Sequence, residues 1–325
     1  MSPVLEVQGL VTSFPGDGDR VPVVDGIDLR IGSGEVLALV GESGCGKSVA
    51  ALSCLRLVPR PGRIEAGRIA VDGRDILPLS VPEMRRVRGH EVSMIFQEPM
   101  TSLNPVTRVG DQVVEAIRLH ERVSRAAARA RTLELFRRVG IPDPEERLDA
   151  FPHQLSGGLK QRVVIAMALA AVPKLLIADE PTTALDVTIQ AQILQLLRDL
   201  QREYRMAVWL ITHDLGIVNE LADRVAVMYA GRIVEEGSRL DVLAGAAHPY
   251  TRGLLRSMPA RATPGERLAE IPGVVPPPDE WPAGCRFATR CERAFEPCSS
   301  EVPGPTDLSG SHRAWCHAVA RERGA

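Results

Sequence analysis

The sequence predicts an α/β protein with a mixed-sheet core, an antiparallel β portion, a helical subdomain and a C-terminal extension that contains cysteines. Residues 1–80 hold short apolar runs separated by glycine-rich turns, which is typical of strands and hairpins. Over residues 111–140, apolar side chains recur at helical spacing. From residue 157 onward, helical and strand-like segments alternate, which favours a mostly parallel sheet covered by helices.

The expected elements follow the chain in this order. Apolar strands are expected at residues 4–11 and 36–40, and the long helical pattern ends at Gly140 and Pro142. The alternating part predicts helices at 157–172, 187–204 and 214–222, and strands at 175–178 and 207–212. A proline-rich stretch over residues 271–282 is typical of a semi-rigid linker or wrapping segment.

Composition excludes several classes of function. The chain has 325 residues, with 39 basic and 41 acidic side chains and a net charge of −2, so a broad basic face for nucleic acid is not favoured. The longest apolar run, Val163–Val172, has ten residues, whereas a membrane-spanning helix needs about 20. Residues 1–3 lack the start of a signal peptide. We expect a cytoplasmic protein that meets a membrane only through partners.

A glycine-rich loop carries the clearest chemical signal. It fits G-x-x-x-x-G-K-[ST], with an apolar strand before it and a helix-compatible run after it, the setting of a phosphate-binding loop. Glycines let backbone N–H groups turn toward phosphates, and a helix N-terminus attracts anions. Lys47 is expected to contact the β- and γ-phosphates, and Ser48 to offer its hydroxyl to Mg²⁺. The loop residues are Gly41, Glu42, Ser43, Gly44, Cys45, Gly46, Lys47 and Ser48.

Two acids follow the apolar strand at residues 175–178. The carboxyl end of such a strand is where α/β proteins bind ligands. Asp179 is predicted to hold the water shell of Mg²⁺. Glu180 is predicted to orient or deprotonate the attacking water, a contribution typically worth about 10²–10⁴ in rate. The alternative is two solvated acids at an exposed strand end. The phosphate-binding loop in the same chain makes this alternative less favoured.

A second anion site is predicted where Leu155 and Ser156 precede two glycines. Ser156 is a good helix N-cap, and Gly157 and Gly158 expose backbone donors. One ATP molecule cannot easily use this site and the first loop together. An ordinary serine-capped helix is the alternative.

Taken together, these motifs resemble the nucleotide-binding subunits of ABC transporters. GESGCGKS, Gln97, LSGG, LLIADEP, Asp186 and His213 occur in the family's order and spacing over about residues 4–240. The resemblance implies an ABC-type P-loop ATPase domain at 1–240, with a helical subdomain near 100–170. In that family two subunits pair head to tail, and ATP lies between the loop of one and the LSGG helix of the other.

The resemblance also implies residue roles. Gln97 would reach Mg²⁺ and the attacking water, His213 would contact the γ-phosphate, and Asp186 would couple the two ATP sites. Phe14 is the candidate for stacking on adenine, although it could equally belong to the core. Ser156 and the glycines after it would contact the partner's nucleotide. One position departs from the family, because Leu159 stands where glutamine is frequent.

Two further segments, Phe96–Pro105 and His248–Leu255, resemble ATPase subunits of dipeptide and oligopeptide importers. This implies ATP hydrolysis that powers peptide import, with a nickel or other solute importer as the alternative; a soluble ABC ATPase acting on nucleic acid or the ribosome is the less favoured reading. The implied partners are a second, related ATPase subunit, two permease subunits and an extracytoplasmic substrate-binding protein. The chain would lie at the cytoplasmic face of the cell membrane.

Four cysteines crowd the extension at residues 241–325: Cys285, Cys291, Cys298 and Cys316. Four thiolates suit Zn²⁺ or an iron–sulfur cluster, and free structural thiols remain a third option. Cysteine pairs two to four residues apart, which are typical of structural zinc, do not occur among them. The importer resemblance extends to this segment and implies a [4Fe–4S] cluster held by all four. In a zinc site, His312 or His317 could replace a cysteine.

Overall fold

The computed structural model describes residues 3–97, 102–183, 185–258 and 270–324. The chain forms two compact units. Unit 1 comprises Met1–Leu5, Ile31–Glu35 and Val71–Leu210, and unit 2 comprises Glu6–Arg30, Val36–Ala70 and Ile211–Ala325. Of the importer-like segment Phe96–Pro105, residues 98–101 lie outside the described part.

The strands of unit 1 run as the apolar patterns predict. β6 (Val92–Ile95) and β7 (Leu175–Asp179) pair in parallel, with Ile95 opposite Ala178. β7 is buried along its whole length, as expected for a parallel strand covered on both faces. β8 (Ala207–Thr212), also buried throughout, ends just past the boundary of the unit.

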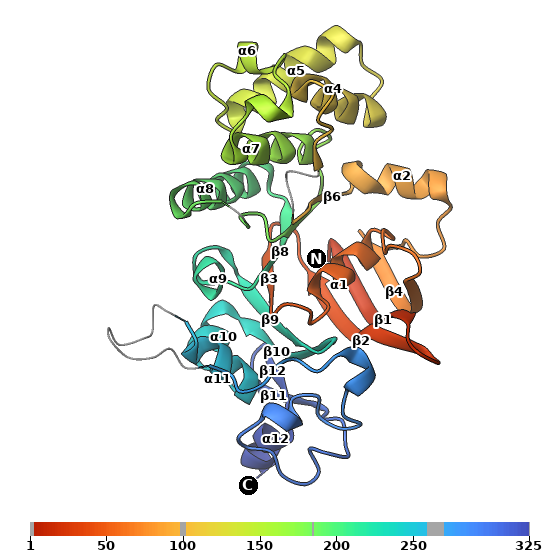
Figure 1. Cartoon of the computed structure of the whole chain (residues 1–325), viewed down its shortest axis with the longest axis vertical. Helices are drawn as coiled ribbons and strands as arrows, with labels where there is room; N and C mark the ends of the chain where they lie inside the picture. Colours follow the sequence, from red (N-terminus) through yellow and green to blue (C-terminus); the bar gives the residue numbers. More distant parts are fainter. Residues whose placement is uncertain (1–2, 98–101, 184, 259–269, 325) are drawn as a thin grey trace. The chain divides into compact units, whose positions relative to one another are not determined.

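A group of helices in unit 1 forms the predicted helical subdomain (Figure 1). α4 (Val109–His120) packs against α5 (Arg125–Arg138) and α7 (Gly157–Ala168), and α5 packs against α6 (Pro144–Arg147). The helical pattern expected over 111–140 is present as two helices, and Ser124 caps the second by accepting a hydrogen bond from the Ala127 N–H. The helices of this unit are α2 (Val81–His90), α4 (Val109–His120), α5 (Arg125–Arg138), α6 (Pro144–Arg147), α7 (Gly157–Ala168) and α8 (Val187–Tyr204).

Unit 2 contains two sheet portions. In one, β1 (Leu5–Pro15) lies between β2 (Arg20–Ile31) and β4 (Arg63–Val71). In the other, β3 (Val36–Val40) pairs in parallel with β9 (Arg224–Tyr229). β9 then pairs antiparallel with β10 (Arg232–Ser238). Parallel and antiparallel pairs therefore share one sheet, which confirms the predicted mixed core.

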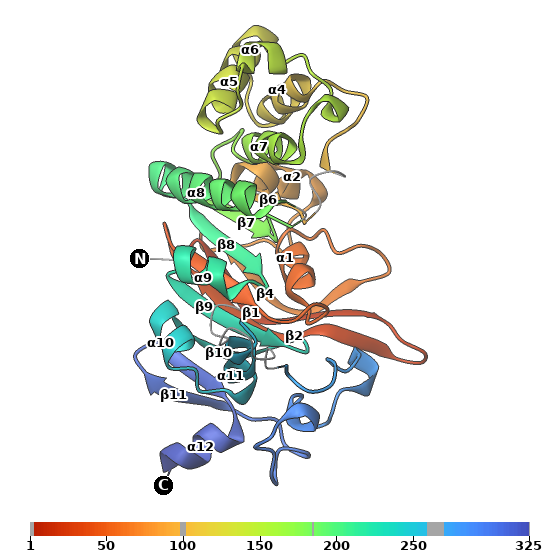
Figure 2. The ribbon, with the colours of Figure 1, turned by 60° about the vertical axis from the view of Figure 1, so that its left-hand side comes forward.

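The C-terminal extension adds strands to this sheet. β12 (His312–Trp315) pairs antiparallel with β10 and with β11 (Pro305–Ser309). Figure 2 shows this hairpin followed by α12 (His317–Gly324). The sequence had predicted a proline-rich linker before it but no hairpin. The tail is therefore part of the sheet of unit 2 and not a loose appendage.

Helices cover the sheet of unit 2 and close its core. Side chains of α9 (Leu215–Leu221), α10 (Arg239–Ala244) and α11 (Pro249–Arg256) belong to one buried cluster. In it Tyr229, Tyr250 and Phe287 meet, with ring centroids 4.6–5.4 Å apart. Phe287 comes from the extension, so the core joins the strands to the cysteine-bearing loop. The helices of this unit are α1 (Lys47–Cys54), α9 (Leu215–Leu221), α10 (Arg239–Ala244), α11 (Pro249–Arg256) and α12.

Candidate active site

The glycine-rich loop joins β3 to α1 in unit 2, which is the predicted strand–loop–helix arrangement. A Cβ on Gly46, which has φ +105°, would lie 2.6 Å from the Val23 carbonyl oxygen, and a Cβ on Gly41 would overlap the Met228 carbonyl oxygen. Lys47 is buried, and its Nζ donates to the carbonyl oxygens of Gly41 (2.8 Å) and Glu42 (3.0 Å). The loop is thus a close-packed turn that only glycine permits at these positions.

The cysteine of the loop is not set up as a nucleophile. Cys45 is 1% exposed. Burial raises the pKa of its thiol, although Lys47 acts in the opposite direction, so the thiol stays protonated.

Glu42 of the loop is held by two side chains from beyond residue 240. The Glu42 N–H donates to the Tyr250 hydroxyl at 2.8 Å. The Glu42 carboxylate receives two bonds from Arg290, at 2.8 and 3.0 Å. Neither contact with Glu42 was predicted from the sequence, which suggested Arg290 only as a charge that would offset a cluster on the nearby cysteines. Tyr250 belongs to the importer-like HPYT motif.

The predicted catalytic acids lie in unit 1 at the carboxyl end of β7. Asp179 is 3% exposed, and Glu180 is half-buried with φ +46°. The Glu180 carboxylate accepts from Gln97 Nε2 at 3.3 Å and from the Thr183 hydroxyl at 3.0 Å. The structure thus brings Gln97 and Glu180 together, because β6 and β7 run in parallel and end side by side. Thr183 was not predicted.

A left-handed backbone at a residue other than glycine is strained by about 1–2 kcal/mol. Strain of this kind concentrates at functional sites, and Glu180 combines it with hydrogen bonds from Gln97 and Thr183.

The LSGG segment begins α7 as predicted. Ser156 is the exposed N-cap and accepts from the Leu159 N–H at 3.4 Å. A Cβ on Gly158 would lie 2.7 Å from a methyl group of Ile189 on α8, so this glycine also allows two helices to approach. Gln161, fully buried, donates to the Pro181 carbonyl oxygen at 2.6 Å and ties α7 to the chain after Glu180.

The three remaining predicted site residues, Asp186, His213 and Phe14, lie in different parts of the chain. Asp186 caps α8 by accepting from the Ile189 N–H at 3.0 Å. His213, in unit 2, is exposed and directly follows β8. Phe14 is half-buried, and its ring lies beside Gly62. Coupling of ATP sites, contact with the γ-phosphate and stacking on adenine remain predictions for these three residues.

The four extension cysteines are free thiols. Cys298 and Cys316 are buried, and the Cys285 N–H donates to the Cys298 carbonyl oxygen at 2.8 Å. Burial, aided by the other three thiols, raises the pKa of Cys285 to about 11. Among the residues that the structure describes, no group of three or more His, Cys, Asp or Glu side chains is arranged to hold a metal ion.

The two histidines suggested as zinc ligands have other partners. His312 Nε2 lies 2.8 Å from the fully buried Glu235 carboxylate. His317 Nε2 lies 2.9 Å from the Glu301 carbonyl oxygen. The structure therefore gives no support to a zinc site in which either Nε2 replaces a cysteine.

Comparison with known proteins assigns the two parts of the chain. Residues 24–183 match the ABC transporter family model, and residues 234–298 match the oligopeptide/dipeptide transporter C-terminal region. A probable peptide ABC transporter ATP-binding protein of Sinorhizobium fredii is 52% identical, over 96% of this chain and 94% of the relative. The oligopeptide transport ATP-binding protein OppD of Bacillus subtilis is 51% identical, over 96% and 88%.

Solved structures agree. The ATP-binding cassette MJ0796, a dimer in a post-hydrolysis state bound to ADP and phosphate, superposes with a TM-score of 0.64 at 26% identity, covering 72% of this chain and 98% of the cassette. In the described parts of the chain, no helix is both long enough and apolar enough to cross a membrane. With its phosphate-binding loop, its LSGG helix and its C-terminal region, the chain belongs to the family of ABC transporter ATP-binding subunits, in the group that carries the oligopeptide/dipeptide transporter C-terminal region.

Proposed function

We propose that this chain hydrolyses ATP to power peptide import through a membrane ABC transporter. The observation that carries the proposal is the loop Gly41–Ser48, whose packing excludes side chains at Gly41 and Gly46 and in which the Lys47 Nζ donates to two loop carbonyl oxygens. The peptide transport names of relatives near 50% identity support the substrate class. A nickel or other solute importer is the alternative.

In this proposal each residue has a defined role. Lys47 and the loop N–H groups bind the phosphates. Ser48, Gln97 and Asp179 offer a hydroxyl, an amide oxygen and a carboxylate, the oxygen donors that Mg²⁺ prefers. Glu180 accepts the proton of the attacking water or orients it. Catalysis then rests mainly on positioning and electrostatics, as is usual for phosphoryl transfer.

The remaining assignments are also proposals. His213 contacts the γ-phosphate, and Phe14 stacks on adenine. Ser156, Gly157 and Gly158 meet the nucleotide of a partner, and Asp186 couples the two sites. The division into an ATPase domain at 1–240 and an extension at 241–325 belongs to the same proposal.

The partners follow from the transporter assignment. A second, related ATPase subunit would pair with this chain. Two permease subunits would hold the pair at the cytoplasmic face of the membrane, and an extracytoplasmic binding protein would deliver the peptide. The dimeric form of the MJ0796 cassette supports the pairing.

We further propose that Cys285, Cys291, Cys298 and Cys316 hold a [4Fe–4S] cluster. Besides burial, neighbouring thiols of this set help to raise the pKa of Cys285, Cys291 and Cys316, and four cysteine thiolates are the usual ligand set of such a cluster. Among the residues that the structure describes, these side chains do not form a metal-binding group. A zinc ion on the same four thiolates is the alternative.

Glu180→Gln tests the catalytic proposal. Glutamine keeps the shape of the side chain but cannot accept the proton, so we expect ATP hydrolysis by the assembled transporter to fall by about 10²–10⁴ while ATP still binds. Hydrolysis is measured as phosphate release in proteoliposomes with the partner subunits. Glu203→Gln, which changes a half-exposed carboxylate on α8 paired with Arg138, is the matched control. Hydrolysis at the wild-type rate in Glu180→Gln would contradict the assignment.

A further inference from the structure

The C-terminal extension holds the phosphate-binding loop through an ion pair. The Arg290 side chain is 4% exposed and the Glu42 side chain 30%. Both guanidinium NH groups bond to the two carboxylate oxygens, at 2.8 and 3.0 Å. Bidentate arginine–carboxylate pairs are among the stronger hydrogen-bonded interactions, and they fix the relative orientation of the two side chains as well as their separation.

Arg290 is itself anchored by carbonyl groups. Its Nε donates to the Pro272 carbonyl oxygen at 2.8 Å, and one NH group reaches the carbonyl oxygens of Ile271 and Gly273 at 3.3 and 3.2 Å. The guanidinium therefore cannot swing away from Glu42 without losing several bonds. It connects the loop to the proline-rich segment that the sequence predicted as a linker or wrap.

A second contact acts on the backbone of the loop. The Glu42 N–H donates to the hydroxyl of Tyr250, a fully buried side chain on α11. Burial, together with the neighbouring Cys45 thiol and Glu42 carboxylate, raises the pKa of Tyr250 well above its usual value. The hydroxyl therefore stays neutral and remains able to accept this bond.

We propose that Arg290 and Tyr250 are positioning residues for the phosphate-binding loop, so that the extension sets the affinity for nucleotide. The proposal rests on the proposed function, in which this loop binds ATP. Arg290 also balances the charge of Glu42, a carboxylate inside a loop that must attract phosphates. Without the guanidinium, an unbalanced negative charge would remain beside the bound anion.

This double role predicts an order of affinities that a purely structural ion pair would not give. Arg290→Met removes both the anchor and the balancing charge. Glu42→Gln removes the ion pair and, with it, the negative charge of the Glu42 carboxylate. The double variant should therefore bind ATP like Glu42→Gln and better than Arg290→Met, because the charge that Arg290 balances is gone.

The experiment titrates the full-length chain with a fluorescent ATP analogue and Mg²⁺. We expect about ten-fold weaker binding for Arg290→Met, within the range of coupling between contacting residues. We expect a smaller loss for Glu42→Gln and Tyr250→Phe, and partial recovery in Arg290→Lys. Hydrogen exchange of the Gly41–Ser48 amides should speed up in the same order.

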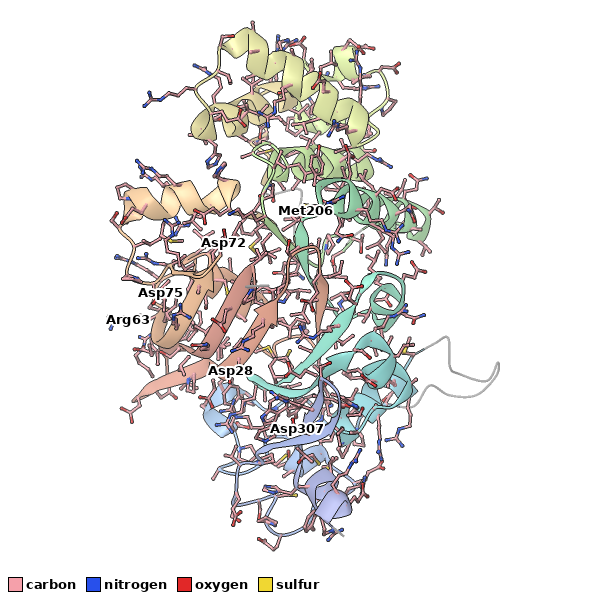
Figure 3. The ribbon with its side chains drawn as sticks, turned by 180° about the vertical axis from the view of Figure 1, so that it is seen from behind. Asp28, Arg63, Asp72, Asp75, Met206 and Asp307 are labelled. Carbon is pink, nitrogen blue, oxygen red and sulfur yellow. The ribbon has the colours of Figure 1, made fainter. Side chains whose placement is uncertain are left out.

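The matched control is Arg313→Met. Arg313 forms an ion pair with Asp307 (labelled in Figure 3) across the C-terminal hairpin, at 2.7 Å. Its replacement should leave the affinity for ATP unchanged. Iron content is measured in every variant, and Glu42→Gln, remote from the cysteines in sequence, separates loop effects from loss of metal.

Wild-type affinity in both Arg290→Met and Glu42→Gln, or losses that add in the double variant, would overturn the inference. A wild-type chain that binds no nucleotide would instead refute the proposed function.

Discussion

At the scale of single residues, His248 has an unusual environment. It is the N-cap of α11, and its Nδ1 accepts from the Tyr250 N–H at 3.0 Å. The backbone N–H of His248 donates to the buried Glu235 carboxylate at 2.9 Å. The Nε2 atom is buried without a hydrogen-bond partner. Burial, and to a smaller extent the charge of Arg252, lowers the pKa of the imidazole to about 3.

This shift predicts a dependence of stability on pH. Between pH 6.5 and about pH 3 the unfolded chain binds a proton at His248 that the folded chain does not, so the free energy of unfolding falls as the pH falls. From pH 6.5 to pH 5 the loss is about 2 kcal/mol. His248→Asn keeps an N-capping side chain and should remove this part of the slope in urea unfolding at pH 7 and pH 5. His153→Asn, at an exposed histidine, is the control, and an unchanged slope in His248→Asn would refute the prediction.

At the scale of elements, the extension is fastened to the sheet through Glu235. This fully buried residue of β10 accepts from the N–H groups of Ala247 and His248 before α11, and its carboxylate meets His312 of β12. One carboxylate thus joins a strand, a helix start and the C-terminal hairpin. Buried carboxylates persist only with such partners. These contacts anchor the chain on both sides of the segment that carries Cys285, Cys291 and Cys298.

The four extension cysteines allow a direct test of the proposed cluster. On anaerobically purified protein we expect about four iron and four acid-labile sulfide per chain, and loss of both in Cys285→Ser or Cys316→Ser. Cys54→Ser, at a buried thiol of α1, should keep them. Metal analysis and an absorbance spectrum provide the measurement. Zinc without iron, or no metal at all, would reject the cluster and leave the ATPase assignment intact.

At the scale of the whole molecule, the exposed start of the LSGG helix is a candidate contact with a second subunit. Ser156 and Gly157 are exposed at the start of α7, where backbone donors attract anions. In the proposed function their ligand is the ATP bound to another subunit. The nucleotide would then act as part of an interface.

A change in mass with nucleotide is therefore expected. Glu180→Gln with ATP and Mg²⁺ should give a dimer, with itself or with the second ATPase subunit, because slow hydrolysis preserves the nucleotide at the interface. Ser156→Arg should prevent the dimer while ATP binding to the loop remains, since the bulky side chain blocks the helix start. Light scattering measures the mass and filter binding measures the nucleotide. A monomer in both variants at saturating ATP would contradict the pairing.

The sequence alone determined the local parts of this protein. The phosphate-binding loop, the strand that ends at Asp179 and the helix after Ser156 follow from glycine spacing, apolar runs and capping residues, which act over a few neighbours in the chain. Their positions agree with the structure to within a few residues. The helical pattern predicted over 111–140 is confirmed by α4 and α5, but the break between them depends on Ser124, which caps α5.

Only the tertiary structure decided the contacts between distant residues. Gln97 meets Glu180 across 83 positions, and Arg290 meets Glu42 across 248. No periodicity encodes such pairs, because they depend on which strands become neighbours and how the loops between them run. The C-terminal hairpin joins the sheet for the same reason, since β10 supplies an edge that the local sequence of β12 does not reveal. The sequence therefore determined the chemistry of the loop, and the fold decided which side chains hold it in place.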